Sequence, residues 1–104
     1  MEQKNKHLNK YNEFFKNRPL FYIEYKDSQE YAKIYNLLND KGYSGTYFEK
    51  FPISSNNISV FEIFKYSEFK SKTINKNTKN IISYNELMEE GFDHWYIFYI
   101  NIKN

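Results

Sequence analysis

One segment of this chain has residues that mark both the beginning and the end of an α-helix. In DSQEYAKIYNLLNDKG (27–42), Asp27 can accept hydrogen bonds from the amides of the first turn, and Glu30 can reach back to close a capping box. Gly42 can take the left-handed conformation that ends a helix. The residues at helical spacing that we expect to be buried are Tyr31, Ile34, Tyr35 and Leu38.

A second, shorter segment has the same signals. Ser83 is placed to cap a helix over residues 83–91, and Glu86 completes its capping box. Ile82 can pack on Leu87 as a hydrophobic staple, and Gly91 ends the helix. The sequence therefore predicts two helices separated by about 40 residues.

Strand-like sequence lies around these helices. Residues 20–26 (LFYIEYK) alternate, are rich in aromatic and β-branched side chains, and are apolar on both faces, which is typical of a central strand. The other runs that we predict to be strands are 46–51, 58–66 and 95–102, the first two forming an antiparallel hairpin around Pro52. Residues 67–80 are polar, and we expect a mobile loop with at most a weak strand at 69–74.

These elements predict an α+β domain. Leu8, Tyr11, Phe14 and Phe15 recur at helical spacing, so an N-terminal amphipathic helix over residues 3–17 comes first. The βαββαβ core over residues 20–102 then has the order of a ferredoxin-like fold. We expect an antiparallel sheet with strands 20–26 and 58–66 in its interior and helices 27–41 and 83–91 on one face.

The composition narrows the class of protein. With 104 residues the chain is expected to be a single domain, 1–104, and without cysteine it can form neither disulfides nor thiolate zinc sites. The polar N-terminus does not resemble a signal peptide, and no segment is apolar enough to cross a bilayer. We therefore expect a cytoplasmic protein with no membrane partner, in the cytoplasm of a host cell.

Catalytic patterns are scarce. The three glycines, at 42, 45 and 91, allow neither a P-loop nor a dinucleotide-binding fingerprint, and there is no nucleophile elbow. Glu90 and His94 could form an acid–base or metal site, but a solvated acidic turn is the simpler interpretation. We expect no enzymatic activity, no cofactor and no metal.

The charge of the chain is segregated. The net charge is +2, yet residues 65–80 hold five lysines against one glutamate, whereas residues 83–94 hold only acidic charges. The basic loop 65–80 and exposed aromatic side chains could bind nucleic acid or a nucleotide, although the aromatic motif of RNA-recognition domains is missing. The candidate phosphate contacts are Lys70, Lys72, Lys76 and Lys79.

Two segments, Phe21–Tyr43 and Ile82–Leu87, resemble small accessory proteins of phages and other mobile elements. In those proteins a strand and a helix ending in Leu-x-x-x-Gly-aromatic precede an Ile-Ser-Tyr-x-Glu-Leu segment. The resemblance covers about a third of the chain and implies an inhibitor of bacterial defence, such as an anti-CRISPR protein, that acts by binding. It carries over no catalytic residue.

Our leading hypothesis is therefore a non-enzymatic binding protein that blocks a surface of a host defence protein, such as a defence effector that handles nucleic acid. Tyrosine, which is favoured at interfaces, is abundant here. The acidic helix could imitate nucleic-acid phosphates toward a basic groove. The predicted partner-binding residues are Glu86, Glu89, Glu90 and Asp93.

The predicted last strand, 95–102 (WYIFYINI), poses a further question. A final strand in a ferredoxin-like order lies at a sheet edge, and this one has no charge or proline to protect it. The N-terminal helix, a second copy of the chain or a target that adds a strand could cover it, and we favour a homodimer. The predicted self-association residues are Trp95, Tyr96, Phe98 and Tyr99.

Overall fold

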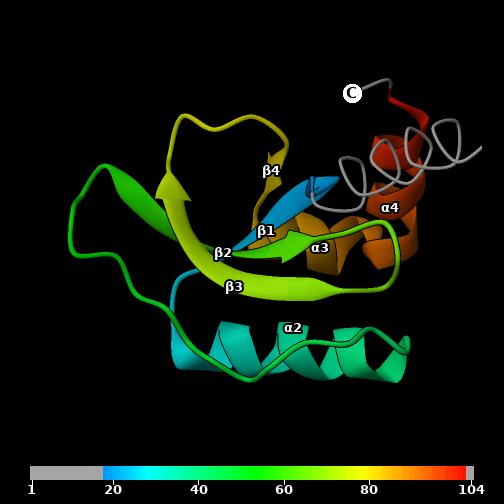
Figure 1. The fold of residues 1–104 in the computed structure, drawn as a ribbon, viewed down its shortest axis with the longest axis horizontal. Coiled ribbons are helices and arrows are strands. Elements are labelled where there is room, and N and C mark those ends of the chain that lie inside the picture. Colours follow the sequence, from blue (N-terminus) through cyan, green and yellow to red (C-terminus); the bar gives the residue numbers. More distant parts are fainter. Residues whose placement is uncertain (1–17, 103–104) are drawn as a thin grey trace, which may run out of the picture.

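The computed structural model describes residues 18–102, in which a four-stranded sheet is combined with three helices (Figure 1). The helix predicted for residues 3–17 lies outside the described residues. In chain order the elements are β1 (Phe21–Tyr25), α2 (Ser28–Asp40), β2 (Asn57–Ile63), β3 (Phe69–Asn75), β4 (Ile81–Ile82), α3 (Tyr84–Glu90) and α4 (Phe92–Asn101).

The strand order across the sheet is β3-β2-β1-β4. The prediction that the segments 20–26 and 58–66 form interior strands is confirmed, because β1 and β2 are the two central strands. They pair antiparallel, as do β2 and β3, but β4 pairs parallel to β1, so the sheet is mixed. The α+β class is confirmed, whereas the βαββαβ order is replaced by βαβββαα.

The core lies on one face of the sheet. β1 contributes Phe21, Ile23 and Tyr25, which are almost completely buried. Residues of α2, α3 and α4 pack against them, namely Tyr31, Ile34, Leu38, Leu87, Phe92 and Tyr99. The helices predicted at 27–41 and 83–91 therefore lie on the same face, as expected.

The N-cap of α2 and the capping box of α3 form as predicted, but Glu30 reaches back to the amide of Lys26 and not to that of the cap residue Asp27. The Asp27 carboxylate accepts a hydrogen bond from Glu30 N at 2.8 Å, and the Glu30 carboxylate accepts one from Lys26 N at 3.0 Å. At α3, Ser83 and Glu86 make both bonds of the capping box. Gly91 has φ +90°, a value that side-chain-bearing residues rarely adopt, and it ends α3 where α4 begins.

The predicted strand 95–102 is wrong, because residues 92–101 form helix α4. Phe92 and Tyr99 are both buried against Phe21, and the Phe21 and Tyr99 rings stack with their centroids 4.9 Å apart. A separation of seven residues places two side chains on the same side of a helix. Burial of these rings against the sheet thus outweighs the local β propensity of the segment.

The predicted hairpin of 46–51 with 58–66 is also wrong. Residues 46–51 form no strand, and β2 pairs instead with β3, which lies in the segment predicted as a mobile loop. The weak strand suggested at 69–74 is in fact a seven-residue strand whose Phe69 is buried in the core. Edge strands of a sheet commonly carry charged side chains, so the polar sequence of β3 resembles that of a loop.

We predict that Leu38→Ala lowers the free energy of unfolding by about 2–5 kcal/mol, because Leu38 is fully buried and the cavity left behind cannot close completely. Urea unfolding followed by circular dichroism measures the effect. Asn36→Ala, at an exposed position of the same helix, is the control and should change stability by no more than about 0.5 kcal/mol. Equal values for the two variants would contradict the assignment of the α2 core stripe.

Candidate functional site

Two short segments within residues 18–102 each expose four large apolar side chains, one at 97–102 around the end of α4 and one between α2 and β2. We call residues 46–53 the aromatic loop. Phe48 is 54% exposed and Ile53 is fully exposed, and Tyr47 and Phe51 are each about half exposed. Figure 1 shows this segment passing alongside α2 before it turns up toward β2. Several exposed apolar side chains on one short segment make it a candidate binding surface.

Two core tyrosines hold this loop in place. The Tyr31 hydroxyl accepts a hydrogen bond from Phe48 N at 2.6 Å. The Tyr25 hydroxyl accepts one from Lys50 N at 2.8 Å and donates to Lys50 O at 2.9 Å. The backbone groups of Phe48 and Lys50 are thus bonded to side chains rather than to a neighbouring strand.

Further contacts hold the first half of the loop. The Glu49 carboxylate accepts hydrogen bonds from the hydroxyls of Tyr47 and Ser28, each at 2.9 Å. The Tyr47 ring packs edge-on against the Tyr31 ring, with 4.8 Å between centroids. The exposed side chains are therefore presented by a backbone that is held at several points.

An open groove of about 750 Å³ separates the aromatic loop from the beginning of β3. It is lined by Ser44, Gly45, Thr46, Phe48, Lys50, Glu68, Phe69, Lys70 and Ser71. At its end Gly45 lies so close to the Phe69 ring that a Cβ atom would overlap the ring, so a glycine is required there. The Tyr25 hydroxyl, 2.7 Å from Ser71 Oγ, links the two sides of the groove below Lys50.

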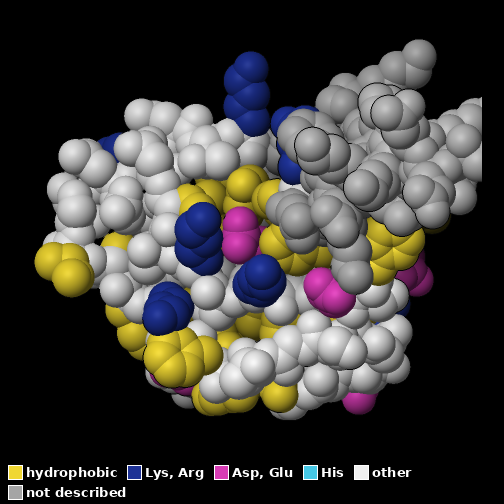
Figure 2. Space-filling model, viewed as in Figure 1, with side chains coloured by type: hydrophobic (Ala, Val, Ile, Leu, Met, Phe, Trp, Pro, Cys, Tyr) yellow, Lys and Arg dark blue, Asp and Glu magenta, His cyan; other side chains and the backbone are white. Residues whose placement is uncertain are grey.

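Basic side chains lie beside this groove. Lys50 Nζ is 4.0 Å from the centroid of the Phe48 ring, close enough for a cation–π interaction. Lys70 and Lys72 project from β3 on the sheet face opposite the core, since they pair with Glu62 and Val60 of β2. Figure 2 shows this face, with lysine side chains around an acidic one.

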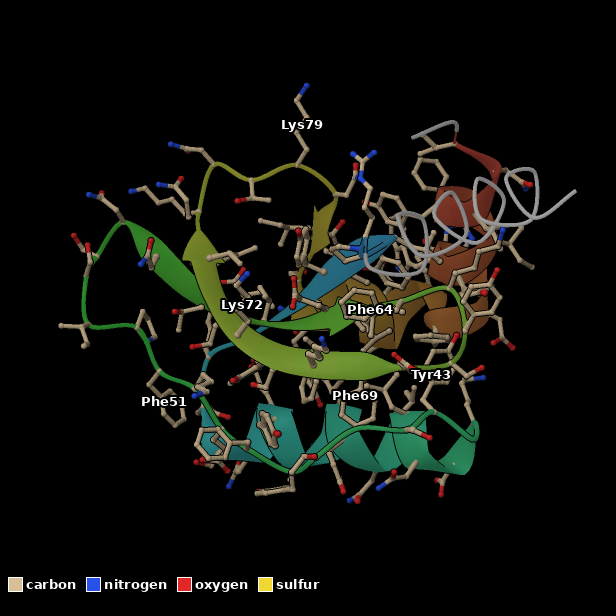
Figure 3. The ribbon with its side chains drawn as sticks, viewed as in Figure 1. Tyr43, Phe51, Phe64, Phe69, Lys72 and Lys79 are labelled. Carbon is tan, nitrogen blue, oxygen red and sulfur yellow. The ribbon has the colours of Figure 1, made fainter. Side chains whose placement is uncertain are left out.

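The structure separates the four predicted phosphate contacts. Lys70 and Lys72 share one face of β3, whereas Lys76 and Lys79 follow the strand in the turn toward β4. Figure 3 shows Lys72 over the sheet and Lys79 pointing away from it. Of the four, Lys70 lines the groove together with Lys50.

Glu62 is the acidic residue of this basic face. Its side chain is buried, and burial raises the pKa of its carboxyl above the usual value, while Lys72 and Lys70 act in the opposite direction. Because burial is the largest effect, the charged carboxylate is less favourable in the folded chain than in the unfolded one. Glu62 therefore lowers stability as the pH rises through its pKa.

The predicted acidic residues lie on another part of the molecule. Glu86, Glu89 and Glu90 are exposed on α3, and Asp93 is exposed in the first turn of α4. Two of them are already engaged, because Glu86 closes the capping box and Asp93 forms an ion pair with Lys41 at 2.9 Å. Glu89 and Glu90 are the other two exposed acidic residues, and Glu90 lies beside His94.

Glu90 and His94 come within 3.9 Å of each other, so they share a side of the helix corner despite Gly91. Both side chains are about half exposed. Within residues 18–102, no group of three or more histidine, aspartate and glutamate side chains is placed to hold a metal ion.

The predicted self-association edge is wrong, because its four residues lie on helix α4. Trp95 donates from Nε1 to Glu86 O at 3.0 Å, and the Tyr96 hydroxyl donates to Lys65 O at 3.0 Å. Tyr99 is buried, and only Phe98 is largely exposed. The helix bonds its own backbone groups, so it offers no strand edge for a second copy.

The sequence interpretation missed the aromatic loop as a surface. Its apolar residues favour a strand, yet Tyr47 and Phe48 are adjacent, as are Glu49 and Lys50, which breaks the alternation of a strand. That break, followed by Pro52, was the available signal. The tyrosines that hold the loop lie 17 and 25 residues away and could not be identified from local sequence.

We predict that Tyr25→Phe lowers the free energy of unfolding by about 1–3 kcal/mol, because the backbone groups of Lys50 lose their partner while the ring still fills the core. Hydrogen exchange at the Lys50 amide should become faster. The matched control is Tyr35→Phe, whose hydroxyl makes no hydrogen bond within residues 18–102 and whose removal should leave that amide unchanged. Unaltered exchange in Tyr25→Phe would show that the tyrosine does not hold the loop.

None of the helices within residues 18–102 combines the length and hydropathy that a membrane-spanning segment needs. Comparison of the chain with protein-family models, with curated proteins and with solved structures finds no match, so a function for this chain rests on its own residues and their geometry.

Proposed function

We propose that this chain is a non-enzymatic binding protein of a phage or other mobile element, and that it inhibits a host defence protein by covering one of its surfaces. The observation that supports this most directly is the aromatic loop, because it exposes Phe48, Phe51 and Ile53 on a backbone anchored to the core. The likeness of Phe21–Tyr43 and Ile82–Leu87 to mobile-element accessory proteins supports the biological context.

The loop has the properties of an interface centre. Aromatic side chains contribute a large share of binding energy at protein interfaces. A loop that is already ordered loses little conformational freedom on binding, and the hydrogen bonds from Tyr25 and Tyr31 supply that order here. Lys50 and the lysines of β3 would form the polar rim.

The acidic helix α3 is the alternative contact surface. Glu89 and Glu90 could face a basic groove of a nucleic-acid-handling protein, as the phosphates of a nucleic acid do. We favour the aromatic loop, because Asp93 and Glu86 already have partners within this chain. The two surfaces involve different residues and can be tested separately.

We predict that the tagged protein retains a specific host protein from lysate and that adding the chain to that purified protein inhibits it. Phe48→Ala combined with Phe51→Ala should weaken retention at least about tenfold, because the exposed rings would supply much of the contact. Glu89→Gln combined with Glu90→Gln is the matched control and should retain the partner normally.

Two results would contradict the proposal that the chain binds a host protein through the aromatic loop. Loss of retention in the glutamine variant but not in the alanine variant would move the interface to α3. Turnover of a nucleotide, peptide or sugar by the purified chain, abolished by a change at Glu90 or His94, would replace binding by catalysis.

A second candidate function is nucleic-acid or nucleotide binding at the basic face. The specific observation that favours it is the arrangement of Lys50 over the Phe48 ring, next to the groove that Lys70 also lines. Exposed aromatic rings beside cations can stack on bases while the cations contact phosphates.

For this candidate we predict that affinity for a single-stranded oligonucleotide falls steeply with salt, by about 0.7 log–log slope units per phosphate contact. Replacing both Lys70 and Lys72 with Gln should reduce the slope by roughly one to two units, whereas Lys79→Gln should leave it nearly unchanged. Fluorescence polarisation measures both. Absence of binding at low salt would exclude this function.

A further inference from the structure

β3 is an edge strand with part of its outer side unpaired. Two bonds at the ends of the β2–β3 pair show which residues of β3 bond to β2. Phe64 N donates to Glu68 O at one end, and Lys76 N donates to Asn56 O at the other. Antiparallel pairing alternates, so Lys70, Lys72 and Ile74 direct their backbone groups toward β2. The residues between them direct theirs outward.

The outward groups at the beginning of β3 are occupied. Phe69 N donates to Ser44 O at 2.9 Å, and Ser44 N donates to Ser67 O at 2.8 Å. Beyond that point the chain leaves the edge, because the aromatic loop bonds to the tyrosine hydroxyls instead. Within residues 18–102, no hydrogen bond reaches the outward N–H and C=O groups of Ser71 and Thr73.

The unpaired edge lies next to the groove. Phe69, Lys70 and Ser71 form one side of the groove, and Phe48 and Lys50 lie on the other. Unpaired backbone groups along one wall and an aromatic side chain on the opposite wall are what an extended segment requires when it adds to a sheet. β3 pairs with β2 without a bulge over all seven residues, so its edge is regular.

The lysine side chains of β3 determine which kind of strand can pair with this edge. A twofold pairing of two β3 strands centred on Ser71 or Lys72 would place at least one of the lysines 70 and 72 opposite a lysine of the other copy, which is destabilising. A second copy is therefore disfavoured. Acidic side chains at alternate positions of an added strand would instead lie opposite Lys70 and Lys72.

We infer that the edge of β3 binds an extended segment of another protein by strand addition, and that this segment alternates acidic with apolar side chains. The acidic side chains lie over Lys70 and Lys72, and the apolar ones turn toward the groove and Phe48. This strand-addition site rests on the proposed function, because it names how a partner protein is held.

The probe is a fluorescein-labelled peptide of alternating Glu and Val residues, and its affinity for the full chain is measured by fluorescence polarisation. The same peptide N-methylated at its backbone amides cannot pair with a strand edge and should bind at least about tenfold more weakly. A peptide alternating Lys and Val should not bind.

Substitutions in the protein itself provide a second test of the edge. Thr73→Pro removes an outward N–H without removing a bond to β2, so the sheet should persist while affinity for the peptide falls at least about tenfold. Lys70→Gln and Lys72→Gln should each weaken binding several-fold, and Lys79→Gln, which makes the same charge change away from the edge, should not.

Equal affinity for the methylated and unmethylated peptides would overturn strand addition even if Thr73→Pro failed to fold. No binding of the unmethylated peptide, with retention of the host protein still dependent on Phe48 and Phe51, would overturn the strand-addition site alone. If the chain retained no host protein, or if the retained protein were not inhibited, the proposed function would be overturned instead.

Discussion

The packing of the inner face of β1 is the interaction on which the rest of this structure depends. Phe21, Ile23 and Tyr25 are buried on one side of the central strand, and all three helices contribute side chains to the core around them. Phe21 stacks on Tyr99 of α4, and Tyr25 packs edge-on against Tyr31 of α2 with 4.9 Å between ring centroids. Each helix thus takes its position from a strand of five residues.

This core also determines the shape of the surface. Tyr25 and Tyr31 bury their rings, but their hydroxyls reach the backbone of the aromatic loop. A tyrosine can combine these two roles because only the end of its side chain is polar. The exposed Phe48 and the open edge of β3 are consequences of the same arrangement, since a loop bonded to hydroxyls leaves the outward groups of Ser71 and Thr73 unpaired within the described residues.

The elements that could be predicted from sequence are those whose signals are local. α2 and α3 have caps within a few residues of their ends, and β1 has the apolar pattern of a buried strand, so all three were identified with nearly correct bounds. α4 was not, because its aromatic and β-branched residues favour a strand locally and become helical through burial of Phe92 and Tyr99. The sequence predicts a loop in place of β3, because an edge strand with lysines resembles a loop. Of the candidate site, the sequence indicates only Lys70 and Lys72, since the loop and the edge depend on contacts distant in sequence.

Buried tyrosines with a second role make this surface easy to alter during evolution. Tyrosine and phenylalanine codons differ at a single nucleotide, and the two rings fill nearly the same space. A lineage could therefore exchange Tyr25 or Tyr31 and keep a packed core, while the loop above it gained freedom to take other shapes. Under the binding function proposed above, the hydroxyl oxygen would be a point at which recognition varies with little change to the fold.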